Sequence, residues 1–498
     1  MKKLSTILII LFLIGNISLT AQENYVKNEL ILRVKKGITE KEVSYEFKDI
    51  NLTSVKALSK RMNIWLYRFD DTKIDKDDVL YKIRTSNKIE QVQRNHFVEL
   101  RKGITEKDNF NPSNNKVNIP NDPRFGEQWA LNNTGQSSGT IDADIDAVEA
   151  WDLSFGGPTA LNDEVVIAII DGGIDLNHQD ISYFKNELEI PNNGIDDDNN
   201  GYVDDYHGWD AYSSDGTIPS DDHGTHVAGI AAAIGNNGLG VVGVNPNAKI
   251  LPIAGSSGTE SIVVEAYGYV LEMRARYNET NGAEGAFIVA TNASFGVDYG
   301  NPANYPIWCG IYDDLGEVGV LSCGATANIN LNVDVQGDVP TACGSDFLIS
   351  VTNTTDDDLK NSGAAYGATT IDLGAPGTSI LNATPGNSYG YKTGTSMATP
   401  TVTGAIALLY SAANESLMQS YKENPAEVAL QMRQFLLESV DPISSLNGIT
   451  VTGGRLNIYN AILNVIAEPD DIPPTVISDL AVTDTTSNSL TLTWTVPS

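Results

Sequence analysis

The chain has 498 residues, of which 41% are hydrophobic, so it is long enough for roughly two to four domains with a large buried core. Its 64 acidic residues outnumber the 32 basic ones and leave a formal net charge of −32. This balance argues against binding to nucleic acid or to an anionic membrane surface, because both need a basic patch on the protein.

The first 21 residues have the order of charge and hydropathy that is typical of a secretory signal peptide. Lys2 and Lys3 precede an apolar run at residues 7–14, and small residues follow up to Ala21. No later stretch of the sequence reaches about 18 consecutive apolar residues. We therefore expect a protein that is secreted to the extracellular space and has no membrane span.

Residues 22–118 are expected to form a small α+β domain. Residues 29–34 and 64–69 alternate like half-buried strands, and the lysine-rich segments between them indicate helices. This part is more basic than the rest of the chain. An asparagine- and proline-rich stretch at residues 109–123 indicates an exposed, cleavable linker.

Residues 119–467 contain short apolar strands that alternate with helical segments. This pattern predicts βαβ units and an α/β domain with a mainly parallel central sheet. Residues 468–498 start as an acidic, proline-containing linker and continue as a strand-rich tail.

The three cysteines, Cys309, Cys323 and Cys343, allow one disulfide in an oxidising compartment and leave one thiol over. Cys323 ends an apolar run and fits a buried, small hydrophobic residue. The sequence does not assign the pairing.

Two glycine-rich segments contain an acid and a base. In VVIAIIDGGID, Asp171 stands at the carboxyl end of a buried parallel strand, where catalytic groups of such sheets lie, although an isolated Asp there could equally cap a helix. In DHGTHVAG, His223 stands at a helix start with His226 one turn later. The pair could suggest a zinc site, but no third ligand or HExxH pattern accompanies it, so His223 is the better candidate for a catalytic base.

A third segment, GTSMATP, places Ser396 at a helix N-terminus, where backbone N–H groups favour a developing oxyanion. Alone, this serine could be an ordinary helix cap. A serine nucleophile needs a base, and the base needs a carboxylate that fixes its tautomer. The chain order Asp, His, Ser is the order found in subtilisin.

Together and in this order, the three segments resemble the signature segments of the subtilisin-like serine peptidase family, and the resemblance extends over about residues 121–465. It implies a subtilisin-like three-layer α/β fold and peptide-bond hydrolysis through an acyl-enzyme. Asp171 would orient the base, His223 would be general base and acid, and Ser396 would be the nucleophile. The alternative is a catalytically silent binding or adhesion protein on the same fold, which the intact triad argues against.

The resemblance also implies an asparagine that donates a hydrogen bond to the oxyanion. In CGATANINLNVDVQGDVP, Asn328 fits this role, with Asp334 and Pro340 at the expected spacing. Ala327 replaces the glycine that usually precedes this asparagine, and Asn332 is the competing candidate. Residues 292–296 resemble the family's substrate-binding strand end, where an extended protein substrate would pair with the backbone of Ser294, Phe295 and Gly296.

Calcium is the cofactor that the resemblance implies. The segment GNNGLGVVGV resembles the family's calcium loop, with side-chain ligands Asp180 and Asn237 and carbonyl ligands Gly235, Leu239 and Val241. Separately, DDDNNGYVDD matches the front of an EF-hand loop through Asp196, Asp198, Asn200 and Asp204. His207 stands where an EF-hand has its bidentate glutamate, so a polar surface turn is the alternative.

The two ends of the chain fit the same family. Residues 22–118 look like an inhibitory propeptide, and we expect the protein to cut itself between about Lys102 and Asp122; a permanent accessory domain is the alternative. The tail resembles the opening strands of a fibronectin type III domain, with Trp494 as its core aromatic residue. The expectation is a truncated domain, with cell-surface retention provided by a part that is missing here.

Overall fold

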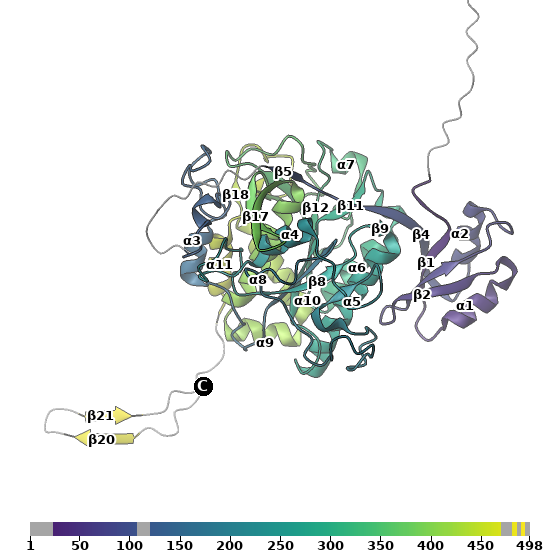
Figure 1. The fold of residues 1–498 in the computed structure, drawn as a ribbon, viewed down its shortest axis with the longest axis horizontal. Coiled ribbons are helices and arrows are strands. Elements are labelled where there is room, and N and C mark those ends of the chain that lie inside the picture. The colour runs from purple at the N-terminus through teal and green to yellow at the C-terminus, as the bar shows by residue number, and fades with distance from the viewer. Residues whose placement is uncertain (1–22, 107–119, 470–480, 486–489, 494–498) are drawn as a thin grey trace, which may run out of the picture.

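The computed structural model describes residues 23–106, 120–469, 481–485 and 490–493 (Figure 1). The predicted signal peptide, most of the predicted linker and Trp494 lie outside these residues. Within the described ranges, no helix combines the length and the apolar character needed to cross a bilayer.

The N-terminal unit, residues 23–96, is a four-stranded antiparallel sheet with two helices. The strand order is β4-β1-β3-β2. Leu30 and Leu32 on β1 face a small core shared with Val43 and Val79 of the helices, whereas Ile31 points to the opposite face and packs on the main body. The elements are β1 (Tyr25–Val34), α1 (Glu40–Glu46), β2 (Thr53–Ser59), β3 (Ile64–Arg68), α2 (Lys76–Arg84) and β4 (Ile89–Leu100).

The main body, residues 120–469, is built on a nine-stranded sheet in the order β18-β19-β15-β14-β12-β10-β6-β8-β7. Every neighbouring pair is parallel except β18 and β19 at one edge. The strands are β6 (Val166–Asp171), β7 (Trp209–Asp210), β8 (Lys249–Ala254), β10 (Ile288–Ala293), β12 (Leu321–Ala325), β14 (Leu348–Thr354), β15 (Leu373–Pro376), β18 (Asp441–Pro442) and β19 (Gly454–Arg455).

Helices cover both faces of this sheet. Along β6, Val166 and Ala168 lie in the core beneath α5 and α6, while Ile167 and Ile169 lie in the core beneath α4 and α8. This confirms the predicted three-layer α/β fold. The helices are α3 (Ala147–Leu153), α4 (Asp222–Ala232), α5 (Glu260–Thr280), α6 (Pro306–Glu317), α7 (Val333–Gln336), α8 (Thr395–Ala412), α9 (Glu415–Glu423), α10 (Pro425–Glu438) and α11 (Ile458–Ile466).

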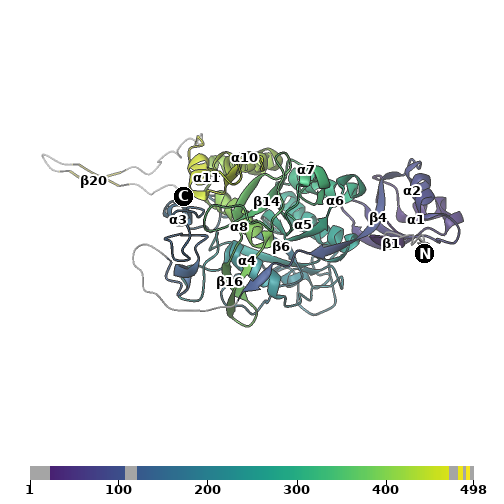
Figure 2. The same ribbon diagram turned by 90° about the horizontal axis from the view of Figure 1, so that it is seen from above.

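Strand β4 runs out of the N-terminal unit into the main body, as the view from above shows (Figure 2). It pairs there with β9 and β11, and the following β5 pairs with β17. The remaining strands are β5 (Ile104–Glu106), β9 (Gly258–Thr259), β11 (Phe295–Asp298), β13 (Asp338–Val339), β16 (Ile380–Thr384), β17 (Ser388–Thr393), β20 (Ala481–Thr485) and β21 (Leu490–Thr493).

The cysteine pairing that the sequence left open is Cys309 with Cys343, which ties α6 to the loop after β13. Cys323 on β12 is free and buried, in agreement with its interpretation as a small hydrophobic residue. Burial raises the pKa of its thiol to about 12, so it stays protonated and unreactive.

Candidate active site

Three candidate side chains from three elements lie at the carboxyl edge of the central sheet. Asp171 ends β6, and His223 and Ser396 are the second residues of α4 and α8. The Asp221 carboxylate caps α4 by accepting hydrogen bonds from the backbone N–H groups of His223 at 2.8 Å and Gly224 at 3.0 Å. This cap fixes the helix start at the histidine.

Asp171 and His223 form a buried pair. His223 Nδ1 lies 3.0 Å from Asp171 Oδ1 and 2.9 Å from Oδ2. Glycine is required at position 224, because a Cβ there would lie 2.0 Å from the carbonyl oxygen of Gly173 and 3.0 Å from Asp171 Cβ. Burial opposes protonation of the imidazole, but the Asp171 carboxylate beside it raises the pKa of His223 above its ordinary value.

The Ser396 hydroxyl and the Asn328 amide contact the same carbonyl oxygen, that of Arg101. Ser396 Oγ donates to it at 2.5 Å and Asn328 Nδ2 at 3.3 Å. Asn328 Oδ1 accepts from the backbone N–H of Thr395 at 2.9 Å, which turns the amide NH₂ group toward the carbonyl. His223 Nε2 is buried and has no hydrogen-bond partner among the described residues.

Asn332 and His226, the two neighbouring candidates, form other hydrogen bonds. Asn332 caps α7, since its Oδ1 accepts from the backbone N–H of Asp334 at 3.1 Å. His226 Nε2 donates to the Gly390 carbonyl at 3.0 Å. Burial, together with Lys392, lowers the pKa of His226 to about 3, so this second histidine is neutral.

Residues 97–106, here called the cleft segment, pass through the site as extended chain. The backbone N–H of Arg101 donates to the Ser294 carbonyl at 3.3 Å. Beyond Arg101, residues 104–106 pair with β17. The three residues that the sequence assigned to substrate binding therefore pair with the chain itself, in the register Ser294 with Arg101, Phe295 with Leu100, and Gly296 with Glu99.

The Arg101 side chain fills a pocket that the sequence analysis missed, here called the arginine pocket. Its guanidinium donates to the carboxylates of Asp298 and Asp338 and to the carbonyls of Ala325 and Val339. The sequence features that could have indicated this pocket were Arg101, at the end of the last strand before the linker, and Asp338, two residues before Pro340. No local motif joins the two.

The sequence comparison identifies the family. Residues 162–457, more than half of the chain, match the profile of the subtilase family. The chain belongs to the subtilase family. It is 27% identical to a thermophilic serine proteinase of Bacillus sp. (strain AK1) over 88% of each chain, and 30% identical to thermitase of Thermoactinomyces vulgaris over 64% of this chain and 93% of thermitase. The solved structure of fervidolysin from Fervidobacterium pennivorans, 20% identical, superposes with a TM-score of 0.59 over 88% of this chain and 61% of that one, which supports the fold.

The first candidate calcium loop of this subtilase surrounds the buried Asp180. Asn237 Nδ2 donates to Asp180 Oδ1 at 2.6 Å, and the backbone N–H of Val241 donates to Oδ2 at 3.0 Å. Asp122, which the sequence analysis missed, lies beside this loop: its Oδ2 accepts from the N–H of Asn236 at 2.8 Å, and its buried Oδ1 has no partner among the described residues. Burial and the Asp180 carboxylate raise the pKa of Asp122. An unpartnered carboxylate oxygen beside a second carboxylate is a donor set that fits Ca²⁺.

In the second candidate loop, the predicted carboxylates accept hydrogen bonds from backbone N–H groups. The two Asp204 oxygens accept from the backbone N–H groups of Asn193 and Gly194, both at 2.9 Å. Asp196 likewise accepts from the N–H groups of Asn200 and Gly201. Asp198 also accepts from the N–H of Asn200, which it shares with Asp196. The EF-hand ligand set stays a prediction.

A different acidic group forms next to this loop, from Glu189, Asp198 and Asp205. Asn200 Nδ2 donates to Asp205 Oδ2 at 3.0 Å. Burial, with the neighbouring Asp198 carboxylate, raises the pKa of Asp205 to about 7. Of the four predicted ligands, Asp198 alone belongs to this group.

Proposed function

We propose that this subtilase is a secreted serine endopeptidase that uses Asp171, His223 and Ser396 as its triad and Asn328 as its oxyanion donor. One observation carries the proposal: a peptide carbonyl, that of Arg101, receives hydrogen bonds from both Ser396 and Asn328 beside the Asp171–His223 pair. An active protease needs a peptide carbonyl in this position.

In the proposed mechanism, Ser396 Oγ attacks the carbonyl carbon while its proton passes to His223 Nε2, the ring nitrogen for which the described part of the chain offers no hydrogen-bond partner. Asp171 holds the other ring nitrogen and stabilises the imidazolium. Asn328 Nδ2 donates to the oxyanion, a contribution of about 10²- to 10³-fold that is known from subtilisin. His223 then returns the proton to the leaving amine, and water hydrolyses the acyl-enzyme.

The residues 22–118 are proposed to be an inhibitory propeptide, because the cleft segment occupies the place of a substrate. Two side chains of β4 also complete the main body: Asn95 Oδ1 accepts from the N–H of Ser261 at 2.9 Å, and Gln93 Oε1 from that of Ile307 at 2.6 Å. These are first-turn amides of α5 and α6, which lack partners inside their helices. A unit that supplies such contacts supports folding as well as inhibition.

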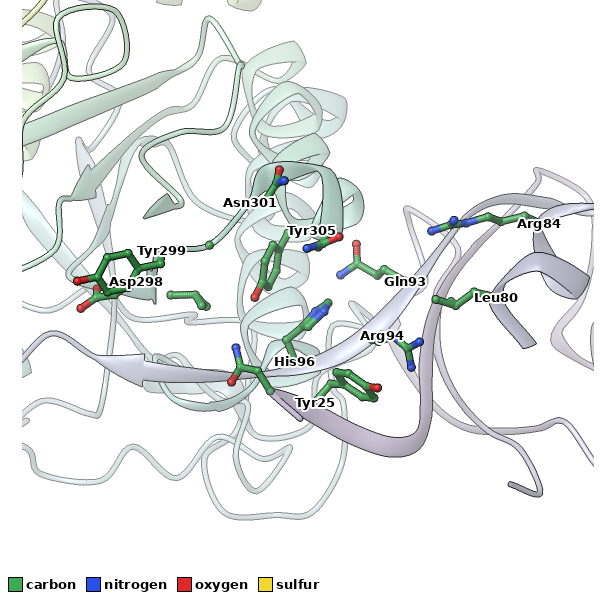
Figure 3. Close-up of a pocket in the computed structure, with 14 residues that line it drawn as sticks. Tyr25, Leu80, Arg84, Gln93, Arg94, His96, Asp298, Tyr299, Asn301 and Tyr305 are labelled. Carbon is green, nitrogen blue, oxygen red and sulfur yellow. The ribbon is translucent and has the colours of Figure 1, made fainter. Parts of the chain in front are cut away.

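The seam between the two parts contains a cavity of about 370 Å³ (Figure 3). Beside it, the ring of His96 lies 4.3 Å from that of Tyr305, and His96 Nδ1 lies 2.8 Å from the buried carboxylate of Glu260. Side chains of both parts line the cavity, so we interpret it as part of the propeptide interface and not as a separate substrate site.

Calcium is proposed to bind at the Asp180 loop, held by Asp122, Asp180 and Asn237 with carbonyls of Gly235, Leu239 and Val241. Its chemistry there is structural: it neutralises two neighbouring carboxylates. In Ser396→Ala protein, which cannot digest itself, chelation should lower the unfolding free energy by about 2.7 kcal/mol relative to calcium at 100 times Kd. Asp180→Asn should remove most of this difference, whereas the exposed control Asp313→Asn should keep it.

Secretion and a fibronectin type III-like segment are proposed from residues 1–21 and 468–498. Residues 1–21 would direct export. The antiparallel pairing of β20 with β21 is compatible with the start of a fibronectin type III-like domain in residues 468–498. Mass-spectrometric detection of the protein in the culture medium, without residues 1–21, tests the first proposal.

The protease proposal is tested with Ser396→Ala. We expect loss of peptide hydrolysis by several orders of magnitude and loss of labelling by a serine-directed fluorophosphonate, with an unchanged circular dichroism spectrum. Undiminished turnover in this variant would contradict the proposed role of Ser396 as nucleophile and favour another activity on the same fold.

A further inference from the structure

The carbonyl that contacts the nucleophile identifies one bond. Ser396 Oγ and Asn328 Nδ2 both donate to the carbonyl oxygen of Arg101. The peptide bond within reach of the nucleophile is therefore the one between Arg101 and Lys102. The backbone on both sides is held, by β11 before this bond and by β17 after it. The side chain that precedes the bond is therefore the one that enters the pocket beside the nucleophile.

This pocket holds Arg101 by charge and by hydrogen bonds. The arginine side chain is 4% exposed, and Asp338 is completely buried. Arg101 Nη2 forms an ion pair with Asp338, and its Nε and Nη2 lie 3.3 and 3.2 Å from Asp298 Oδ1. Its Nη1 donates to the Ala325 carbonyl. Thr341 Oγ1 donates to the other Asp338 oxygen, which keeps the carboxylate in place.

The two carboxylates need a cation between them. Asp298 and Asp338 are directly opposite in the antiparallel pair β11–β13. Like charges at such a position repel each other, and a buried carboxylate without a partner is strongly unfavourable. The guanidinium of Arg101 reduces the repulsion between the two carboxylates and gives the buried one a partner. An uncharged side chain in the same place would leave the buried Asp338 unpaired.

Glycine at position 296 gives the pocket its shape. A Cβ there would lie 2.6 Å from the Arg101 guanidinium carbon and 2.2 Å from the Val339 carbonyl oxygen. Any other residue would close the entrance to a guanidinium. The planar fork of arginine also reaches two carboxylates and two carbonyls at once, which the compact ammonium of lysine cannot do from one position.

We propose that this protease selects arginine before the cleaved bond through Asp338 and Asp298, and that its own maturation cut is Arg101–Lys102. The inference rests on the proposed serine protease function. In the cut, Ser396 Oγ bonds to the Arg101 carbonyl carbon, the C–N bond to Lys102 breaks, and the Ser396 proton passes through His223 to the Lys102 amine. Water then hydrolyses the ester and leaves Arg101 as a carboxylate. The bond lies at the edge of the range beginning at Lys102 that the sequence predicted.

The experiment uses the full-length protein after activation and four peptides, Val-Glu-Leu-X with a fluorogenic amide, where X is Arg, Lys, Leu or Phe. We expect kcat/KM for Arg to exceed that for Leu by about 10²-fold or more, and that for Lys by about tenfold. Asp338→Asn should lower the Arg-to-Leu ratio about 10²-fold, and the more exposed Asp298→Asn about fivefold. Asp313→Asn, an exposed loss of the same charge on α6, should leave the ratio as in the parent.

Maturation gives a second measurement that does not need an Asp338 variant to fold. The N-terminus of the activated parent should be Lys102 by mass spectrometry, and Arg101→Leu should slow its formation about 10²-fold. If the parent is labelled at Ser396 by a fluorophosphonate but cuts the Leu or Phe peptide as fast as the Arg peptide, the pocket assignment is wrong and the proposed function stands. If neither label nor cleavage is found, both are wrong.

Discussion

The N-terminal unit meets the main body at two places that differ in their chemistry. At the outer interface, three basic side chains, Arg33, Lys56 and Arg61, pair with acids on α5 and α6. Three of these acids, Glu265, Glu272 and Glu279, recur every seven residues and so lie on one face of α5. In the cleft, by contrast, residues 97–106 pair through their backbone with β11 and β17, and Arg101 adds the charged contacts of the arginine pocket.

The difference separates contacts that only the proposed propeptide can make from contacts that any extended substrate can make. Backbone pairing is tolerant of sequence, so every extended peptide can use it. Partly exposed ion pairs contribute little each but require a partner with matching charges. We therefore expect changes in the cleft to alter catalysis strongly and changes at the outer interface to alter propeptide binding weakly.

Apart from loss of the Ser396 nucleophile, the largest effect is expected from Asn328→Ala. Because this amide acts mainly on the developing oxyanion, kcat should fall about 10²- to 10³-fold with little change in KM. Steady-state kinetics with the Arg peptide measure both constants. Asn332→Ala is the control and should keep kcat; the opposite result would exchange the roles of the two asparagines.

A smaller effect is expected when pH is changed. Burial raises the pKa of Asp338 to about 6, with Asp298 adding to the increase and Arg101 opposing it. Because the carboxyl becomes neutral below this value, the Arg-to-Leu ratio of kcat/KM should fall about tenfold between pH 8 and pH 5. The ratio cancels the titration of His223, which affects both peptides alike. A ratio that does not change with pH would exclude Asp338 as the group that selects arginine.

The smallest effect is expected at the outer interface. Arg61 lies 2.8 Å from Glu272 and 2.6 Å from Glu279, and its side chain is 28% exposed. Arg61→Ala should weaken inhibition by the cleaved propeptide about two- to fivefold and reduce its sensitivity to salt. Arg68→Ala removes a pair with Glu29 inside the same unit and should leave the inhibition constant unchanged. Equal weakening in both variants would indicate a loss of propeptide folding instead.

The fold and the candidate triad could be proposed from the sequence because each signature segment is local. VVIAIIDGGID contains both the strand and its terminal Asp171, and the structure then brings Asp171, His223 and Ser396 to one edge of the sheet. Asn328 was proposed in the same way, although Ala327 departs from the family pattern. The buried Ala327 belongs to a small apolar cluster, so the methyl group is accommodated by packing.

The arginine pocket and the place of Asp122 in the calcium loop depend on contacts between distant parts of the chain. Arg101 and Asp338 are 237 residues apart, and only the folded chain brings them together. Asp122 and Asp180 meet for the same reason. The Asp196–Asp204 ligand set stays a prediction: carboxylates in a glycine- and asparagine-rich turn also accept from nearby backbone N–H groups, a competition that spacing alone does not reveal.

The extended cleft segment also sets a condition on the conformation of any target. Residues 97–100 and 104–106 lie in strands. A strand rises by about 3.3 Å per residue and a helix by about 1.5 Å, so an arginine inside a helix cannot align with β11 and β17. A folded protein would be cut only after about ten residues around the arginine have opened. The cleavage rate of such a protein should then report the free energy of that local unfolding. The bonds after two arginines with identical sequence neighbours could be cut at rates that differ by orders of magnitude.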